Sequence, residues 1–342
     1  MLAAGTLTSL QWDTSHIHRL TPAEGSRLLH GYERVLSEAK AIGRTMSPAA
    51  VVPLLIPQIH TLRELSRRSS ATTRPSIGSL AARYCEYAAW MSQESGDCRA
   101  AQWWVRHMRR SAEEADDKNL IAYADIRLSS VTLYDRDARA TTGLAVRAGS
   151  DSSLPPRTRR SAALREAQGH ALAGDEKACF EALERAAVLS GSVTSDAHVA
   201  LGSTSTENHQ ELVRGWCLLD LGRPEDSART LEESMPSIQS TAFRATARFG
   251  VRRALALAQS GDVEQACLSL HEYLPLVAVI DSETVRSDLV LTQTVLSRWR
   301  SHRPARSLLV DIQDVLGRGR GHESVATQIG IAGSTSGSEL PS

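Results

Sequence analysis

Arginine side chains recur at one place in a repeated pattern along this sequence, and they could bind an anion. Four of them stand eight or nine positions before a turn signal built on Gly or Asp: Arg127, Arg165, Arg214 and Arg252. The planar guanidinium group forms paired hydrogen bonds with carboxylate and phosphate groups. A ladder of such groups on a concave surface would suit a carboxylate, a phosphate or an acidic peptide. The alternative is that each arginine pairs with Asp or Glu on a neighbouring helix.

Aromatic residues and further arginines on the same predicted helices extend this candidate groove. Most Trp and Tyr side chains at helical spacing are expected to pack between repeats, while those on the first helix of a hairpin can reach the inner surface. We therefore predict a groove for a ligand or partner that is formed by Arg83, Trp90, Tyr123, Arg127, Arg165, Arg214, Arg248 and Arg252.

No other pattern indicates catalysis or a bound cofactor. His16 and His18 lie near Asp13, but two imidazoles without a third fixed ligand favour a solvated segment over a metal site. The Gly-Arg-Gly-Arg-Gly string that begins at Gly317 follows no predicted strand, so it favours a flexible basic tail over a dinucleotide site. Motifs of serine hydrolases, P-loop proteins and zinc proteases are absent. We expect a protein that is not an enzyme and that needs no metal or cofactor.

Composition is that of a globular protein without a nucleic-acid or membrane partner. Hydrophobic residues make up 42%, charged residues 23%, and the formal net charge of the 342 residues is +0. Basic clusters at 106–110, 157–160 and 298–306 are therefore expected to be solvated helix faces and ends. No apolar run reaches the length of a membrane span. Five cysteines without CxxC spacing fit reduced thiols in a cytoplasmic protein.

A repeat of about 39 residues organises most of the chain. Successive turn signals stand 39, 39, 48 and 39 residues apart, at Gly96, Asp135, Gly174, Gly222 and Gly261. The one long interval contains a stretch rich in Ser, Thr and Gly, residues 190–206, of the kind that a surface loop tolerates. Without that insertion the period would be uniform.

Three columns of this repeat have the side-chain sizes that two closely crossing helices require. The residue nine positions after the turn is aliphatic, the residue five after it is small, and the residue seven before it is small in four of five repeats. In that order the columns are Val105, Leu144, Leu183, Leu231 and Leu270; Ala101, Ala140, Cys179, Ser227 and Ala266; and Ala89, Leu128, Ala167, Gly215 and Ala254. The turn glycine would end the first helix in the left-handed region, and the Asp that follows it in three repeats would cap the second helix.

These patterns predict an all-α fold, an α-solenoid of antiparallel helical hairpins that forms a tetratricopeptide-like superhelix. Residues 1–76 are predicted to be an N-terminal helical segment and linker, 77–317 the repeat array, and 318–342 a mostly disordered tail.

The N-terminal segment is expected to contain two helices. The first covers about 22–43, and the second covers 48–68 with a kink or a late start, because it carries Pro53 and Pro57. Residues 69–76 are expected to link this segment to the first hairpin.

Several stretches resemble the repeat region of actinobacterial transcriptional regulators. They are SLAARYCEYAAWMSQESGDCRAAQWWVRHM, LREAQGHALAGDEKACFEAL, RGWCLLDLGRPEDSARTLEES and ARFGVRRALALAQSGDVEQAC. In that family a helix-turn-helix domain of the XRE class precedes a tetratricopeptide-like sensor region, and the similarity covers roughly residues 78–316. The family's DNA-binding domain has no counterpart in residues 1–70, so we expect a stand-alone sensor module or an internal start. Direct nucleic-acid binding is accordingly not expected.

The expected function is binding. A peptide, small ligand or protein partner would occupy the inner groove and favour one superhelical curvature or one arrangement of a homodimer, which would bias an output carried by a partner. The alternative is a static scaffold for protein–protein interaction that does not respond to a ligand.

Overall fold

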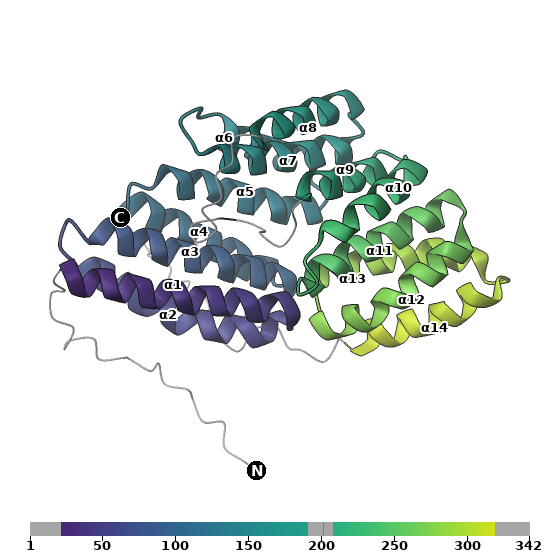
Figure 1. Cartoon of the computed structure of the whole chain (residues 1–342), viewed down its shortest axis with the longest axis horizontal. Coiled ribbons are helices and arrows are strands. Elements are labelled where there is room, and N and C mark those ends of the chain that lie inside the picture. Colours follow the sequence, from purple (N-terminus) through teal and green to yellow (C-terminus); the bar gives the residue numbers. More distant parts are fainter. Residues whose placement is uncertain (1–21, 191–200, 202–207, 319–342) are drawn as a thin grey trace, which may run out of the picture.

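The computed structural model describes residues 22–190, 201 and 208–318, which form helices joined by short turns (Figure 1). These residues contain no β-strand, which confirms the all-α prediction. None of their helices is long and apolar enough to cross a bilayer. The hypotheses for His16, His18 and residues 319–342, and nearly all of the polar insertion, fall outside the described residues.

The described ranges contain fourteen α-helices and two short 3-10 helices. They are α1 (Pro22–Thr45), α2 (Pro48–Arg68), α3 (Arg74–Glu94), α4 (Cys98–Glu114), α5 (Lys118–Tyr134), α6 (Ala138–Gly149), α7 (Pro156–Ala173), α8 (Glu176–Ser190), α9 (His209–Asp220), α10 (Pro224–Ser234), η1 (Met235–Ser237), α11 (Phe243–Ser260), α12 (Val263–Ile280), α13 (Glu283–Leu296), η2 (Ser297–Trp299) and α14 (Arg303–Arg318).

Consecutive helices pack as hairpins, and the hairpins pack against one another. Each odd-numbered helix, here called a first helix, contacts the even-numbered second helix that follows it. First helices also contact each other in sequence, from α1·α3 through to α11·α13. Figure 1 shows the hairpins following one another around the molecule, with α5–α8 between the α1–α4 and α9–α14 groups.

The two ends of this row of hairpins meet. Helix α1 contacts α11 and α12, and α3 contacts α13, although these elements are far apart in the sequence. First helices from both ends therefore enclose the space between them, and any side chains that they direct inwards share one environment.

The turns within hairpins have the predicted chemistry. Four glycines adopt φ between 76° and 90°, in the left-handed region that glycine enters without a steric penalty: Gly96, Gly174, Gly222 and Gly261. The carboxylates of Asp97, Asp175 and Asp262 accept hydrogen bonds from backbone N–H groups three residues later, at 2.9, 3.0 and 3.3 Å. The predicted turn glycines and caps are confirmed.

The α5–α6 turn lies one residue later than the sequence pattern predicts. The left-handed residue of the α5–α6 turn is Arg136, with φ 57°, whereas Asp135 ends α5 in the right-handed region. Counting from Arg136, the three columns contain Ala145, Thr141 and Ser129, which are buried. The predicted members Leu144, Ala140 and Leu128 are wrong, because a period held fixed at 39 residues does not detect a one-residue shift between turns.

The α9–α10 hairpin shows why the three repeat columns need two small residues and one aliphatic residue. A Cβ atom on Gly215 would lie 2.7 Å from the Leu231 side chain, so only glycine fits where the two helices cross. The Ser227 hydroxyl donates a hydrogen bond of 2.7 Å to the carbonyl oxygen of Gly215. All three columns thus meet at one crossing, and the first and second helices of a hairpin are fixed in register there.

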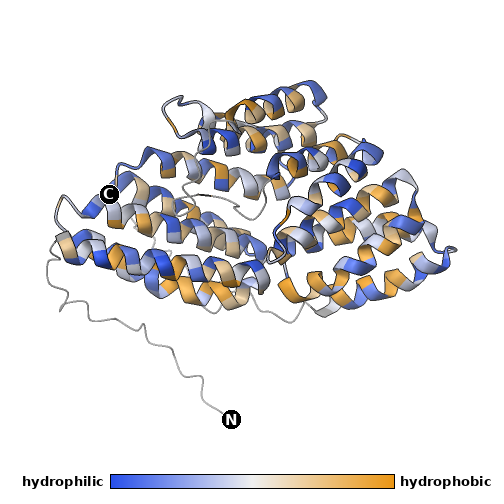
Figure 2. Ribbon diagram, viewed as in Figure 1, coloured by the Kyte–Doolittle hydropathy of each residue, from blue (hydrophilic) through white to orange (hydrophobic). Residues whose placement is uncertain are grey.

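Hydrophobic and hydrophilic residues alternate around each helix, as Figure 2 shows. The apolar faces form one cluster that centres on α1–α5 and another that extends over α11–α14, with smaller clusters between them. Each hairpin therefore buries its apolar face against its neighbours.

The N-terminal helices depart from the prediction in two places. Helix α2 is continuous from Pro48, with Pro53 and Pro57 both exposed inside it, so the late start is wrong. Pro48 occupies the first helical position, where its missing N–H is not needed. Helix α3 begins at Arg74, inside the predicted linker, because Pro75 lies in its first turn and favours helix initiation there.

Candidate functional site

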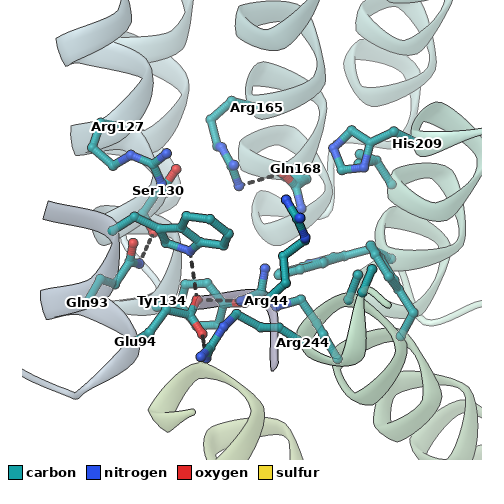
Figure 3. Close-up of a pocket in the computed structure, with 17 residues that line it drawn as sticks. Arg44, Gln93, Glu94, Arg127, Ser130, Tyr134, Arg165, Gln168, His209 and Arg244 are labelled. Carbon is teal, nitrogen blue, oxygen red and sulfur yellow. Dashed lines mark hydrogen bonds and ion pairs between the residues drawn. The ribbon is translucent and has the colours of Figure 1, made fainter. Parts of the chain in front are cut away.

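A cavity of about 100 Å³ lies between the first helices. One water occupies about 30 Å³ in the liquid, so the cavity has room for on the order of three waters. Its walls come from α1, α3, α5, α7, α9 and α11, as Figure 3 shows for the labelled residues. The lining consists of Arg44, Trp90, Gln93, Glu94, Arg127, Ser130, Tyr134, Arg165, Gln168, His209, Val213, Trp216, Ala242, Arg244, Ala245, Arg248 and Phe249.

The same face of successive first helices lines this cavity. Counted back from the left-handed turn residue of each hairpin, most lining residues stand at positions 13, 9, 6 and 2. Steps of three and four residues select one face of an α-helix. The set at position 13 is His209 and Arg248; at 9, Arg127, Arg165 and Val213; at 6, Trp90, Ser130, Gln168 and Trp216; and at 2, Glu94 and Tyr134.

Four of the eight predicted groove residues line the cavity: Trp90, Arg127, Arg165 and Arg248. Of the rest, Arg83 lies near the carboxylates of Glu33, Glu86 and Asp117, and Tyr123 is buried.

Arg214 and Arg252 are also outside the lining. The Arg214 side chain is 50% exposed and pairs with Glu211, because it stands eight residues before its turn, not nine, and so points from a different face. The Arg252 guanidinium lies 3.3 Å from the centre of the Trp216 ring and donates a hydrogen bond of 2.9 Å to Asp288. The predicted ladder of four arginines therefore contributes only Arg127 and Arg165 to the cavity.

Glu94 is the only carboxylate among the described residues of the lining, and both of its oxygens have partners. Its side chain is 1% exposed and pairs with Arg244 and Arg248 of α11. Hydrogen bonds from Ser282, Thr284 and the Trp90 indole N–H, at 2.5, 3.1 and 3.0 Å, complete its surroundings. We call Glu94, Arg244, Arg248, Ser282 and Thr284 the Glu94 cluster.

The Glu94 cluster joins the two ends of the row of hairpins. Arg244 also donates hydrogen bonds to the backbone carbonyls of Gly43 and Met46, at 3.0 and 2.6 Å, so it connects α11 to the end of α1 as well as to α3. Burial by itself would raise the pKa of Glu94, but Arg248 and Arg244 outweigh it and lower this pKa to about 2. Glu94 is therefore a charged structural anchor and not a proton-transfer group at neutral pH.

Two further buried arginines near the cavity also have carboxylate partners. Arg127 pairs with Glu86 of α3, and Arg252 pairs with Asp288 of α13. Burial raises the pKa of Asp288, and one of its oxygens makes no hydrogen bond within the described residues. These pairs connect one first helix to the next.

Arg165 differs from the other arginines of these columns. Its guanidinium donates a hydrogen bond of 2.7 Å to the Gln168 side-chain oxygen, and no carboxylate of the described residues pairs with it. Its Nε makes no hydrogen bond within the described residues, as is also true of Arg127 and Arg252. Burial, and then the neighbouring Arg127, lower the pKa of Arg165 to about 10. An arginine with this pKa is still charged at neutral pH, so the cavity contains an unneutralised cation.

His209 adds a second polar group without a partner. Its Nδ1 makes no hydrogen bond within the described part of the chain. Burial lowers the pKa of His209 to about 4, with further contributions from Arg160 and Arg165. The imidazole is therefore neutral at pH 7 and can donate one hydrogen bond and accept another. We call Arg165, Gln168 and His209 the Arg165 cluster; Figure 3 places it apart from Glu94.

Aromatic side chains supply the apolar part of the walls. Tyr134 and Trp216 meet edge to face with ring centres 5.8 Å apart, and Trp90 lies beneath the Arg127 guanidinium at 5.7 Å. The Tyr134 hydroxyl is buried without a hydrogen-bond partner in the described residues, and burial raises its pKa. The cavity thus combines flat apolar surfaces with hydrogen-bond donors.

Sequence reasoning missed several of these residues. Tyr134 lies on the same helix face as the predicted arginines, and the repeat register finds it once the α5–α6 turn is placed correctly. His209 holds the same repeat position as the predicted Arg248. Arg44 lies in α1, outside the repeats, and no periodic signal points to it. Arg44 has no ion pair with any residue that the structure describes.

The described residues contain no group of three or more His, Cys, Asp or Glu side chains that could hold a metal ion. Comparisons of the chain with protein-family models, with curated proteins and with solved structures found no match. The chemistry of the cavity therefore has to be argued from its own residues.

Proposed function

We propose that this chain is a tetratricopeptide-like array that binds a ligand in its central cavity and acts as the sensor region of a transcriptional regulator. The resemblance of four stretches to the repeat region of actinobacterial regulators supports the family. The stacking of hairpins with small residues at each crossing supports the superhelical arrangement.

The observation that carries this proposal is the repeated composition of the cavity wall. Successive first helices present the same face to one partly open cavity, and that face contains polar atoms without hydrogen-bond partners in the described residues on Arg165, His209 and Tyr134. Buried polar groups are normally paired, so each such group needs a water molecule or a ligand. Their convergence on one cavity favours a binding site over a passive core.

Ligand binding can produce a signal because the Glu94 cluster lies on helices that also line the cavity. Helices α3 and α11 line the cavity and also carry the contact between the two ends of the row. A ligand that contacts both helices stabilises the arrangement in which the ends meet, and its free energy of binding sets the size of that bias. A partner protein that recognises this arrangement would carry the output.

The test is to fill the cavity and measure ligand binding. Ala245 is a small lining residue on α11, so Ala245→Leu and Ala245→Trp fill the cavity progressively. Val188→Trp on the exposed surface of α8 is the matched control. Each protein would be screened by thermal shift against a small-molecule fragment library, and native mass spectrometry would detect molecules that co-purify.

The proposal predicts that fragments bind to the wild type and to Val188→Trp, less to Ala245→Leu, and not to a folded Ala245→Trp. Binding that survives in Ala245→Trp would contradict it. A chain that binds no fragment, but that captures a protein partner equally well in all four forms, would support the static scaffold instead.

A further inference from the structure

The charges on the cavity wall are unbalanced. Its lining contains five arginines, Arg44, Arg127, Arg165, Arg244 and Arg248, and one carboxylate, Glu94. Glu86, outside the lining, pairs with Arg127, while Glu94 is shared by two arginines. Arg165 and Arg44 have no carboxylate partner in the described residues. An anion that entered the cavity would therefore meet an excess of positive charge.

The lack of a partner for Arg165 has a local cause. Arg127, at the equivalent position of α5, pairs with Glu86 on the preceding first helix. Counted from the left-handed turn residue, the position that Glu86 holds on α3 is held by Ile126 on α5. The preceding helix thus offers Arg165 an apolar side chain where Arg127 finds a carboxylate. A half-buried charge without a partner is partly desolvated and uncompensated, so a structural arginine here would gain from such a partner.

The arrangement of hydrogen-bond donors fits an anion as well. Arg165 Nε, the Tyr134 hydroxyl and Arg248 Nε are buried without acceptors within the described residues. Two guanidinium groups and a phenol can surround a carboxylate or phosphate, whose oxygens accept several hydrogen bonds at once. His209 can add one more donor. A neutral or cationic ligand would leave these donors, or the charge of Arg165, unsatisfied.

The volume of the cavity, and its closure on one side, limit the size of its ligand. The two ends of the row meet through α1, α3, α11 and α13, and the Glu94 cluster closes that side with buried ion pairs. A volume of about 100 Å³ admits a small molecule more readily than an extended peptide. The rings of Trp90, Tyr134, Trp216 and Phe249 offer apolar surface to the body of such a molecule.

From these observations we infer that the cavity binds a small organic anion, a carboxylate or phosphate on a flat apolar body, with Arg165 as its principal charge partner. This inference rests on the proposed function, because it names the ligand class of the same cavity. The arginine side of the cavity recognises the charged group, and the aromatic walls recognise the body.

The experiment uses small probes of one shape and different charge on the full chain. Benzoate and phenyl phosphate are the anions, benzamide is the neutral match, benzylamine is the cation, and a tetraglutamate peptide is the extended anion. Isothermal titration calorimetry would measure the dissociation constants for the wild type, Arg165→Gln, Arg165→Lys and Arg214→Gln. Arg214→Gln is the matched control, since Arg214 belongs to the same sequence pattern but points to solvent.

We expect benzoate or phenyl phosphate to bind more tightly than benzamide and benzylamine. Arg165→Gln should weaken anion binding by about tenfold to a hundredfold, the usual range for a lost charged hydrogen bond. Arg165→Lys should recover part of this loss, and Arg214→Gln should leave the affinity unchanged. Thermal unfolding of each variant without probe would establish that it is folded.

Three outcomes would overturn the inference: no binding of either small anion, equal binding of benzamide, or an affinity that Arg165→Gln does not change. Tetraglutamate that binds through Arg165 while the small anions do not would identify a peptide ligand and would also overturn it. If neutral fragments bind and Ala245→Trp removes that binding, the proposed function is supported. In that case only the inference that the ligand is an anion is wrong.

Discussion

The Glu94 cluster and the Arg165 cluster both contribute arginines to the cavity wall, but the arginines of the first are paired with a carboxylate and, within the described residues, that of the second is not. In the Glu94 cluster a buried carboxylate has two arginines and three further hydrogen bonds. In the Arg165 cluster a half-buried arginine has one glutamine side chain as its hydrogen-bond partner. The carboxylate of the first is fully paired in the free protein, whereas the guanidinium of the second has no carboxylate partner among the described residues.

The difference shows that repeat position alone does not decide what an arginine does. Arg127, Arg165 and Arg252 stand nine residues before their left-handed turn residues, yet two are paired with carboxylates and one is not. Whether such an arginine is paired depends on the neighbouring first helix, which supplies Glu86 to Arg127 and Asp288 to Arg252. Paired arginines stabilise the stack of helices, and the unpaired one remains available to a ligand.

The largest expected effect is on stability and comes from the Glu94 cluster. Glu94→Gln removes one charge and leaves Arg244 and Arg248 buried without their carboxylate, which should lower the free energy of unfolding by about 3–5 kcal/mol. Urea denaturation would measure it. Glu114→Gln breaks an exposed ion pair with Arg110 and should cost less than about 1 kcal/mol. Equal losses in the two variants would contradict the structural role of the cluster.

A related effect should appear on acidification. The pKa of Glu94 is lowered from 4.5 to about 2 in the folded chain, so the folded state binds this proton less readily than the unfolded state does. Its contribution, roughly 3 kcal/mol by linkage, is present above the unfolded pKa and is lost as pH falls through the folded pKa.

The stability difference between wild type and Glu94→Gln should therefore shrink between pH 4.5 and 2. The raised pKa of Asp288 acts in the opposite direction, but it is present in both proteins and cancels in the difference. Urea titrations at several pH values would measure this difference, and a constant value across that range would contradict the assignment.

A smaller effect of the opposite sign should come from the Arg165 cluster. Arg165→Gln removes a half-buried cation without a carboxylate partner in the described residues, so in a buffer free of organic anions it should raise the free energy of unfolding by about 1 kcal/mol. Arg127→Gln should instead lower it, because Glu86 is left buried without a partner. Thermal and urea unfolding of both variants would test the comparison. A loss in Arg165→Gln as large as that in Arg127→Gln would mean that Arg165 is structural.

The smallest expected effect is a fractional proton uptake on anion binding. The pKa of His209 is lowered to about 4 by burial and by the positive charges of Arg160, Arg165, Arg248 and Arg157. A bound anion offsets these charges and raises that pKa, so benzoate should bind more tightly as pH falls from 7 towards 5.

Calorimetry of benzoate binding in buffers of different ionisation enthalpy would measure the uptake. It should amount to less than one proton per site and should vanish in His209→Gln. Uptake that persists in His209→Gln would assign the effect to another group.

Much of the fold followed from the sequence, because the determinants of hairpins are local. Glycine turns, Asp caps and small residues at helix crossings repeat at short range, so Gly215, Asp97 and Asp262 could be interpreted without a structure. The α5–α6 turn was misplaced because Arg136, not a glycine, adopts the left-handed conformation there.

The site could be predicted only in part. Arg127 and Arg165 were found from their spacing, but the partner of each arginine depends on contacts between helices. The ion pair of Glu94 with Arg244 spans 150 residues and exists because the two ends of the row meet. No periodic pattern encodes that contact, and the sequence therefore could not separate paired arginines from the unpaired one.

The most direct test of the central claim is the stability of wild type and Arg165→Gln with and without saturating benzoate. Arg165→Gln should be the more stable protein without the anion and the less stable protein with it, since a ligand at about 100 times its dissociation constant adds about 2.7 kcal/mol to the wild type. Such a reversal identifies Arg165 as a ligand group maintained at a cost in stability. If benzoate shifts both proteins equally, or shifts neither, Arg165 is not the anion site.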